Sequence, residues 1–142
     1  MTWQTPKTDW YGSVNSDGTY IGDYFNYNDF NRIKNNLIYL RDMAVKLYKT
    51  FNISSVASDK TPSDYFYADE INQLEQNLNT INAKTINAYY GSSPTYSDNG
   101  HIMDFNELNR LESAILSLYD YLNTQASNRR MFTWNFGIKG GL

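Results

Sequence analysis

The chain has 142 residues and a formal net charge of −3, which fits a single domain large enough to bury a core. It contains no cysteine and a single histidine, His101, which excludes a disulfide framework, a thiolate zinc site and a multi-histidine metal centre. We therefore expect no metal and no cofactor. The acidic balance, without a block of Lys or Arg, argues against nucleic-acid binding through a basic face.

The residues in excess are polar but uncharged. Asn occurs 18 times and Tyr 13 times, whereas charged residues make up 19% of the chain. Such residues form hydrogen-bonding surfaces of the kind used in paratopes and in hydrated protein contacts. No apolar run approaches the roughly 18 residues of a membrane span, and the first 25 residues do not resemble a signal peptide. We expect neither a signal peptide nor a transmembrane segment.

Residues 1–25 are predicted to form an extended N-terminal arm. The arm carries three aromatic residues that we expect to contact a partner: Trp3, Trp10 and Tyr11. Its NSDG sequence at 15–18, like SDNG at 97–100, is typical of a tight turn in which Asn, Asp or Gly takes positive φ. Neither sequence has the alternating acids and distal Glu of a calcium loop.

Residues 26–126 are predicted to form a body of three related units. The segments 25–40, 66–81 and 103–118 align without gaps, about 40 residues apart. Each has an acid, an apolar residue, an Asn, an Arg or Gln and a second apolar residue. The central pairs are Asn31–Arg32, Asn72–Gln73 and Asn109–Arg110. Self-similarity at a fixed period indicates one structural unit copied three times.

Each unit carries apolar residues alternately three and four positions apart, which predicts a helix with one buried stripe. The expected helices cover about 27–51, 68–89 and 105–125. The stripes are Phe30, Ile33, Leu37, Leu40, Ala44, Leu47 and Phe51; Ile71, Leu74, Leu78, Ile81, Thr85 and Ala88; and Leu108, Leu111, Ile115, Leu118 and Leu122.

Two helix starts have a capping-box pattern. Asn26 precedes Asp29 by three residues, and Asp104 precedes Glu107 in the same way. The second unit has a Tyr at the cap position, so we expect Asp69 or Ser63 to set that start.

The repeated Asn and Arg residues have two interpretations each. Asn31, Asn72 and Asn109 either bind a preceding loop or a neighbouring subunit, or satisfy backbone groups of their own helix start. The second interpretation is favoured because Asn is a weak helix former that bonds readily to nearby backbone. For Arg32 and Arg110, ion pairs with helix-start acids of neighbouring units are favoured over a ligand site.

The links at roughly 52–64 and 90–101 are long enough to return along a helix. A parallel, pseudo-threefold arrangement is therefore possible, but up-down-up is favoured because sequential helices usually pack antiparallel. The second link supplies candidates for stacking on a sugar: Tyr89, Tyr90 and Tyr96. Packing of these rings over the helices is the competing interpretation.

A catalytic pair of carboxylates, as a glycosidase uses, is not favoured. Asp23, Asp64 and Asp69 lie among tyrosines, but one acid at each helix start is what capping alone predicts.

Residues 127–142 are predicted to be extended, because apolar residues alternate with Thr133, Asn135 and Gly137 as in a half-buried strand. The alternating aromatic residues are Phe132, Trp134 and Phe136. The two aromatic ends can pair as a small β element or add to a neighbouring subunit. The expected fold is thus mainly α, a three-helix bundle of three related repeats with extended aromatic terminal segments.

The sequences TPKTDWYG and DYFNYNDFNRIKNNLIYL resemble a module in tail and baseplate-associated proteins of phages infecting Gram-positive bacteria. In that module a P-K-T-x-W arm leads into a Y-F-N-x-x-D-x-N-R-I-x-x-N helix. The resemblance covers about the first 45 residues, and the second repeat departs from it at Gln73. It implies structural positions at Trp10, Phe25, Asp29, Asn31, Arg32 and Asn36.

The resemblance implies a non-enzymatic virion subunit of a phage tail, baseplate or tail tip. We expect it to form a homo-oligomer and to bind other virion proteins through the aromatic residues of the two ends, without nucleic acid or membrane insertion. The alternative function is a cell-wall or carbohydrate-binding module that uses the Tyr-rich link. A tail-tip subunit can also bind host glycans, so the two are compatible.

Overall fold

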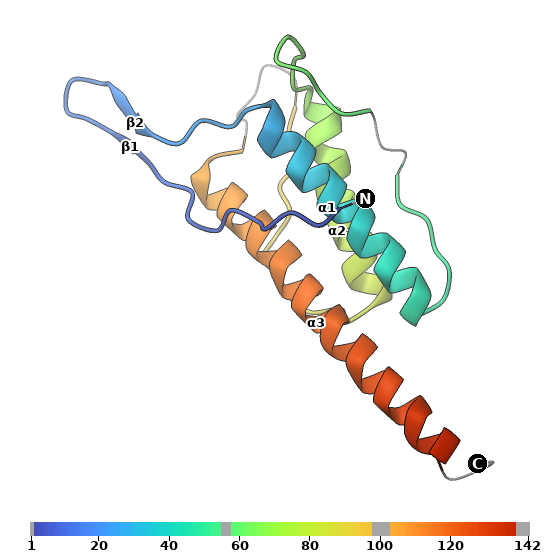
Figure 1. Ribbon diagram of the computed structural model, residues 1–142. Helices are drawn as coiled ribbons and strands as arrows, with labels where there is room; N and C mark the ends of the chain where they lie inside the picture. The colour runs from blue at the N-terminus through green and yellow to red at the C-terminus, as the bar shows by residue number, and fades with distance from the viewer. Residues whose placement is uncertain (1, 55–57, 98–102, 139–142) are drawn as a thin grey trace.

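The computed structural model describes residues 2–54, 58–97 and 103–138, and only the backbone for the last ten of these. The elements in chain order are β1 (Gly12–Val14), β2 (Tyr20–Gly22), α1 (Tyr27–Leu47), α2 (Ala68–Lys84) and α3 (Phe105–Ile138). The three helices pack against one another, and β1 and β2 form a small antiparallel hairpin beside them (Figure 1). The predicted mainly α, three-helix fold is confirmed.

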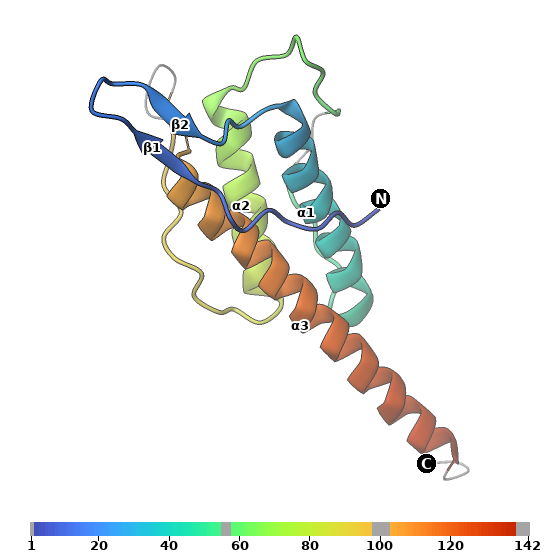
Figure 2. The ribbon, with the colours of Figure 1, turned by 60° about the vertical axis from the view of Figure 1, so that its left-hand side comes forward.

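All three helices run in the same direction, so the favoured up-down-up arrangement is wrong. Their starts lie at one end of the molecule and both links return along the bundle (Figures 1 and 2). Ring contacts agree, because Phe25 and Phe66, which precede α1 and α2, have centroids 5.0 Å apart. At the opposite end, the hydroxyls of Tyr48 and Tyr121 lie 3.1 Å apart.

The helices begin where the sequence predicts, and their stripes form the core. Every stripe residue from Phe30 to Ala44, from Ile71 to Ile81 and from Leu108 to Leu122 is buried. Asn26 forms the expected capping box with Asp29, and Asp104 Oδ1 accepts the Glu107 N–H at 2.9 Å. Neither Asp69 nor Ser63 sets the start of α2. The helix begins at Ala68, and the Glu70 side chain accepts the Tyr67 N–H.

The helix ends differ from the prediction. The helices α1 and α2 end at Leu47 and Lys84, several residues early, and Phe51 joins the core from the link that follows α1. The helix α3 continues to Ile138, so the segment expected to be an extended strand is helical up to that residue. The sequence has no Gly or Pro between 105 and 136, and extending an existing helix costs far less than starting a new element.

The small β element lies within the N-terminal arm rather than between the two ends. Gly12 pairs with Gly22 and Val14 with Tyr20. The NSDG turn closes the hairpin as predicted, with Gly18 at φ +88 and a hydrogen bond from its N–H to the Asn15 carbonyl. The SDNG sequence and His101 lie largely or wholly outside the described residues.

The repeated Asn residues hold extended segments of chain against the helices. Three such segments, which we call straps, end at Trp10, Lys60 and Tyr96. One Asn amide accepts the N–H and donates to the carbonyl of each of these residues, at 2.7–2.9 Å. The pairs are Asn31 with Lys60, Asn72 with Tyr96, and Asn109 with Trp10. The interpretation that these Asn residues satisfy their own helix start is therefore wrong.

The three clamps form a closed cycle. The helix α1 holds the strap that enters α2, α2 holds the strap that enters α3, and α3 holds the strap that precedes α1. Two straps have a second clamp six residues earlier: Asn36 bonds both the N–H and the carbonyl of Gln4, and Asn77 accepts the Ser54 N–H. The equivalent position in α3 is Ala114. The repeated unit is therefore a strap together with a helix.

Replacing Asn72 by Ala should lower the free energy of unfolding by about 2 kcal/mol, because both polar groups of the Tyr96 backbone lose their partner. Urea denaturation followed by circular dichroism measures the change. Asn79→Ala is the matched control on the same helix. Among the described residues, the exposed Asn79 side chain bonds only the Ser93 hydroxyl, so we expect a change within about 0.5 kcal/mol. Equal effects of the two substitutions would contradict the clamp.

Candidate functional site

Arg32 lies at the centre of a buried charged cluster. Its guanidinium bonds both carboxylate oxygens of Glu112 on α3, at 2.7 and 2.8 Å, and Asp29 of its own helix at 2.9 Å. Glu112 is fully buried and also accepts the Lys7 N–H and, at 2.6 Å, the indole N–H of Trp10. Apart from the bond between Arg32 and Asp29 within α1, these hydrogen bonds join different parts of the fold.

Arg110 repeats this arrangement one helix further round the bundle. It bonds Glu75 on α2 and the start acid of its own helix, Glu107. Both Arg residues thus form ion pairs, but the predicted partners are wrong. The helix-start acids that they bind belong to their own helices, and the neighbouring helices supply Glu112 and Glu75 instead. Burial raises the pKa of Glu75 even though Arg110 is adjacent, and one of its buried oxygens has no hydrogen-bond partner among the described residues.

The third position in this cycle has different residues. Gln73 replaces the Arg, and Lys34 occupies the position of Glu75 and Glu112. By the threefold pattern, these two positions correspond to the Arg and the Glu of the interface between α1 and α2, and neither residue type is present there. The buried Lys34 ammonium instead bonds Asp59 of the second strap at 2.5 Å.

The strap ends are buried, which changes the role of two predicted site residues. Trp10 is 5% exposed and Tyr96 8% exposed, so neither has a ring face free for a partner or a sugar. Lys60 is the residue at the end of the second strap that corresponds to Trp10 and Tyr96. Its ammonium bonds Glu70 and lies 5.1 Å from the Phe30 ring centroid. We correct Trp10 from an interface residue to a core residue.

The other predicted aromatic residues do not form one site. Trp3 is half-buried and stacks on Tyr119, with ring centroids 3.8 Å apart. Tyr90 packs against the core, whereas Tyr89 is 84% exposed. The proposed sugar-stacking group of Tyr89, Tyr90 and Tyr96 is therefore not a shared surface. Phe132, Trp134 and Phe136 lie where only the helix backbone is described.

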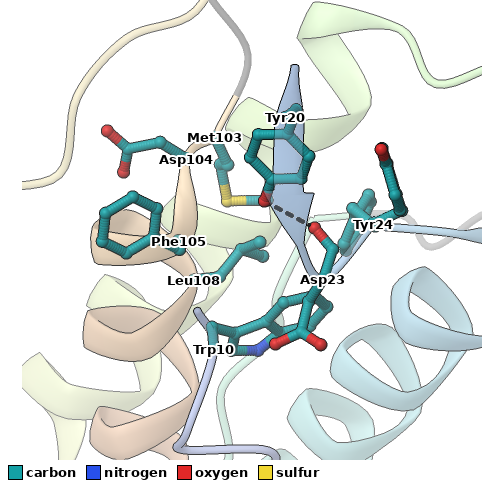
Figure 3. Close-up of a pocket in the computed structure, with 9 residues that line it drawn as sticks. Trp10, Tyr20, Asp23, Tyr24, Met103, Asp104, Phe105 and Leu108 are labelled. Atoms are coloured by element: carbon teal, nitrogen blue, oxygen red, sulfur yellow. Dashed lines mark hydrogen bonds between the residues drawn. The ribbon is translucent and has the colours of Figure 1, made fainter. Parts of the chain in front are cut away.

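A pocket of about 360 Å³ lies between the hairpin and the start of α3 (Figure 3). Most of its lining is apolar or aromatic: Trp10, Tyr20, Tyr24, Phe25, Met103, Phe105 and Leu108. The two acids beside it already have structural partners. Asp23 accepts the Tyr11 N–H at 2.9 Å and lies 3.5 Å from the Lys7 ammonium, and Asp104 caps α3. Such a pocket suits an apolar or aromatic group.

Exposed tyrosines surround this end of the bundle. We call them the tyrosine face: Tyr11, Tyr20, Tyr24, Tyr65 and Tyr67, between 36% and 75% exposed. The rings of Tyr20 and Tyr24 pack edge to face at 5.1 Å. Because the Phe25–Phe66 contact joins the entries of α1 and α2, Tyr24, Tyr65 and Tyr67 lie at the same end. The sequence does carry a signal for this face, because tyrosines are concentrated just before α1 (Tyr20 and Tyr24) and just before α2 (Tyr65 and Tyr67).

No family model, no curated protein and no solved structure matches the chain. Within the described part, no helix combines the length and apolar character needed to span a membrane. The same residues contain no group of three or more His, Asp or Glu side chains placed to hold a metal ion.

Glu112→Gln should lower the free energy of unfolding at pH 7 by about 3 kcal/mol, because it leaves Arg32 and Trp10 poorly paired inside the bundle. Glu75→Gln should cost less than half as much, because Glu75 is only partly satisfied. Urea denaturation of the two variants provides the comparison, and a larger loss for Glu75→Gln would contradict it.

The pH dependence should also identify Glu75. Its raised pKa means that the folded chain binds a proton at a higher pH than the unfolded chain does, so this group stabilises the fold as the pH falls from 7 toward the ordinary carboxyl pKa. Wild type should gain stability relative to Glu75→Gln over that interval. Parallel curves of unfolding free energy against pH for the two proteins would contradict the assignment.

Proposed function

We propose that the chain is a non-enzymatic structural subunit of a phage tail, baseplate or tail tip, and that it assembles through its helix-start end. The observation that carries the proposal is the tyrosine face with its apolar pocket. Exposed aromatic rings beside a concave apolar surface are typical of protein contact sites. The resemblance of the first 45 residues to phage tail modules supplies the class of particle.

The described charged clusters support a structural role. Asp29, Arg32 and Glu112 join α1 to α3 and to the first strap, and Arg110 joins α3 to α2. The charged atoms of these groups are engaged in hydrogen bonds that hold segments of the chain in place. A body fixed in this way can present the tyrosine face in one orientation, which a repeating assembly requires.

The contact surface proposed here differs from the one expected from sequence. Trp3 and Trp10 pack onto the bundle, so the first strap is part of the body. The exposed residues that follow it in the hairpin, such as Tyr11 at 57% and Val14 at 65%, remain accessible. Assembly should therefore depend on the hairpin and the helix starts.

Gold-labelled antibody against the chain should mark one level of the tail on purified particles of the phage that encodes it. Mass spectrometry of the washed particles should detect the chain at a fixed ratio to the other tail proteins. Particles from a phage with a stop codon in this gene serve as the control and should lose the label. Washed particles that lack the chain would overturn the proposal.

A further inference from the structure

The two ends of the bundle carry opposite charge. Because three parallel helices begin at one end, and acids are favoured at helix N-termini, the acids gather there: Asp23, Asp29, Asp69, Glu70, Asp104 and Glu107. The halves of the helices toward the other end carry Arg41, Lys46 and Lys84, and Lys49 follows α1. Among the described side chains in that half, the acids are Asp42 and Asp120. The helix-start end also carries five bases, and four of them pair with acids of the same end: Lys7 with Asp23, Arg32 with Asp29, Lys60 with Glu70 and Arg110 with Glu107. Residues 2–37, 58–76 and 103–118 contain twelve acids against these four bases and Lys34. The molecule therefore has an excess of acids at the helix-start end and of bases at the other.

The helix α3 extends the basic end. It has 34 residues, against 21 in α1 and 17 in α2, and it projects alone past its neighbours (Figures 1 and 2). The sixteen residues after the core residue Leu122 add about 24 Å at 1.5 Å per residue. We call residues 129–138 the tail. Its sequence contains Arg129, Arg130, Phe132, Trp134 and Phe136.

We infer that the tail of one copy docks into the pocket and tyrosine face of a second copy. Positions 129, 132 and 136 of the tail are three or four apart, so the helical backbone places Arg129, Phe132 and Phe136 on one face. The pocket is an apolar hollow of about 360 Å³ at the acidic end. Complementary charge orients the two copies, and burial of aromatic rings supplies the affinity. This inference rests on the proposed function, because it names the partner for the same surface.

The geometry requires two copies. The pocket is lined by residues at the start of α3, Met103 to Leu108. The tail is the far end of the same 34-residue helix, and Figure 2 shows the two ends of α3 far apart. A copy therefore cannot fill its own pocket with its own tail. The contact joins unlike surfaces, so repetition gives an open filament or, where the rotation closes, a ring. Isolated helical turns are marginal in water, and docking gives the tail a packing partner.

Sedimentation velocity of the full chain tests this with two variants. The pocket variant is Tyr24→Lys, which places a positive charge at an exposed pocket-lining position. The tail variant is Phe132→Ala combined with Phe136→Ala, two positions four apart that share one face of the helix. Wild type should assemble as its concentration rises, and less so in high salt. Each variant alone should associate at least about 30-fold more weakly, as expected for loss of a central contact.

Mixing the two variants gives the decisive result. A pocket variant retains its tail and a tail variant retains its pocket, so the mixture should form a one-to-one dimer that grows no further. Tyr89→Lys, which alters a tyrosine that is 84% exposed at the other end of the bundle, is the matched control and should assemble like wild type. Circular dichroism confirms that each variant is folded.

Three results would overturn the inference: a wild type that stays monomeric, variants that assemble like wild type, or a mixture that does not dimerise. If the chain is monomeric in solution but the antibody labels phage tails on purified particles, this inference fails and the proposed function stands. Head-to-tail assembly of a chain that washed particles lack would support the inference as a contact and remove the proposed function.

Discussion

The fold depends on the match between an Asn side chain and a peptide group. The Asn amide offers one donor and one acceptor with nearly the spacing of a backbone N–H and C=O, so it can satisfy both polar groups of one strap residue. A neighbouring strand usually does this for extended chain, and unpaired polar groups in a helix groove are costly. The clamps of Asn31, Asn72 and Asn109 therefore allow the straps to lie against the helices. The returning straps in turn allow the helices to run parallel.

The same cycle explains where the repeats differ. Each charged pair of the cycle joins residues of two different repeats. A repeat that lacks the Arg therefore affects the interface it shares with the neighbouring repeat, where the partner acid would lie. Gln73 of the second unit and Lys34 of the first hold the two corresponding positions between α1 and α2, and Lys34 bonds Asp59 of the adjoining strap. The two departures from the Arg–Glu pattern thus belong to one interface, the one between α1 and α2. The two remaining interfaces keep Arg32 with Glu112 and Arg110 with Glu75.

The sequence predicts the helix starts and the buried stripes because both depend on residues three or four positions apart. It does not predict helix direction, since the bonds that decide it join Asn31 to Lys60 and Asn109 to Trp10, far apart in the chain. An aromatic residue in an arm has the same local sequence signal whether it is buried or exposed, so the sequence does not identify Trp10 as a core residue. The pocket escapes prediction because the fold alone brings the hairpin to the start of α3.

Parallel packing also determines what kind of neighbour each end can bind. In an up-down-up bundle, N-terminal acids and C-terminal bases would be divided between both ends, and the ends would resemble each other. Here every helix begins at the same end, so acids and the entry-loop tyrosines collect there, while Lys46, Lys84 and the tail occupy the other. Helix dipoles add in the same direction. Unlike ends that attract each other favour contacts between different surfaces of two copies over contacts between identical ones.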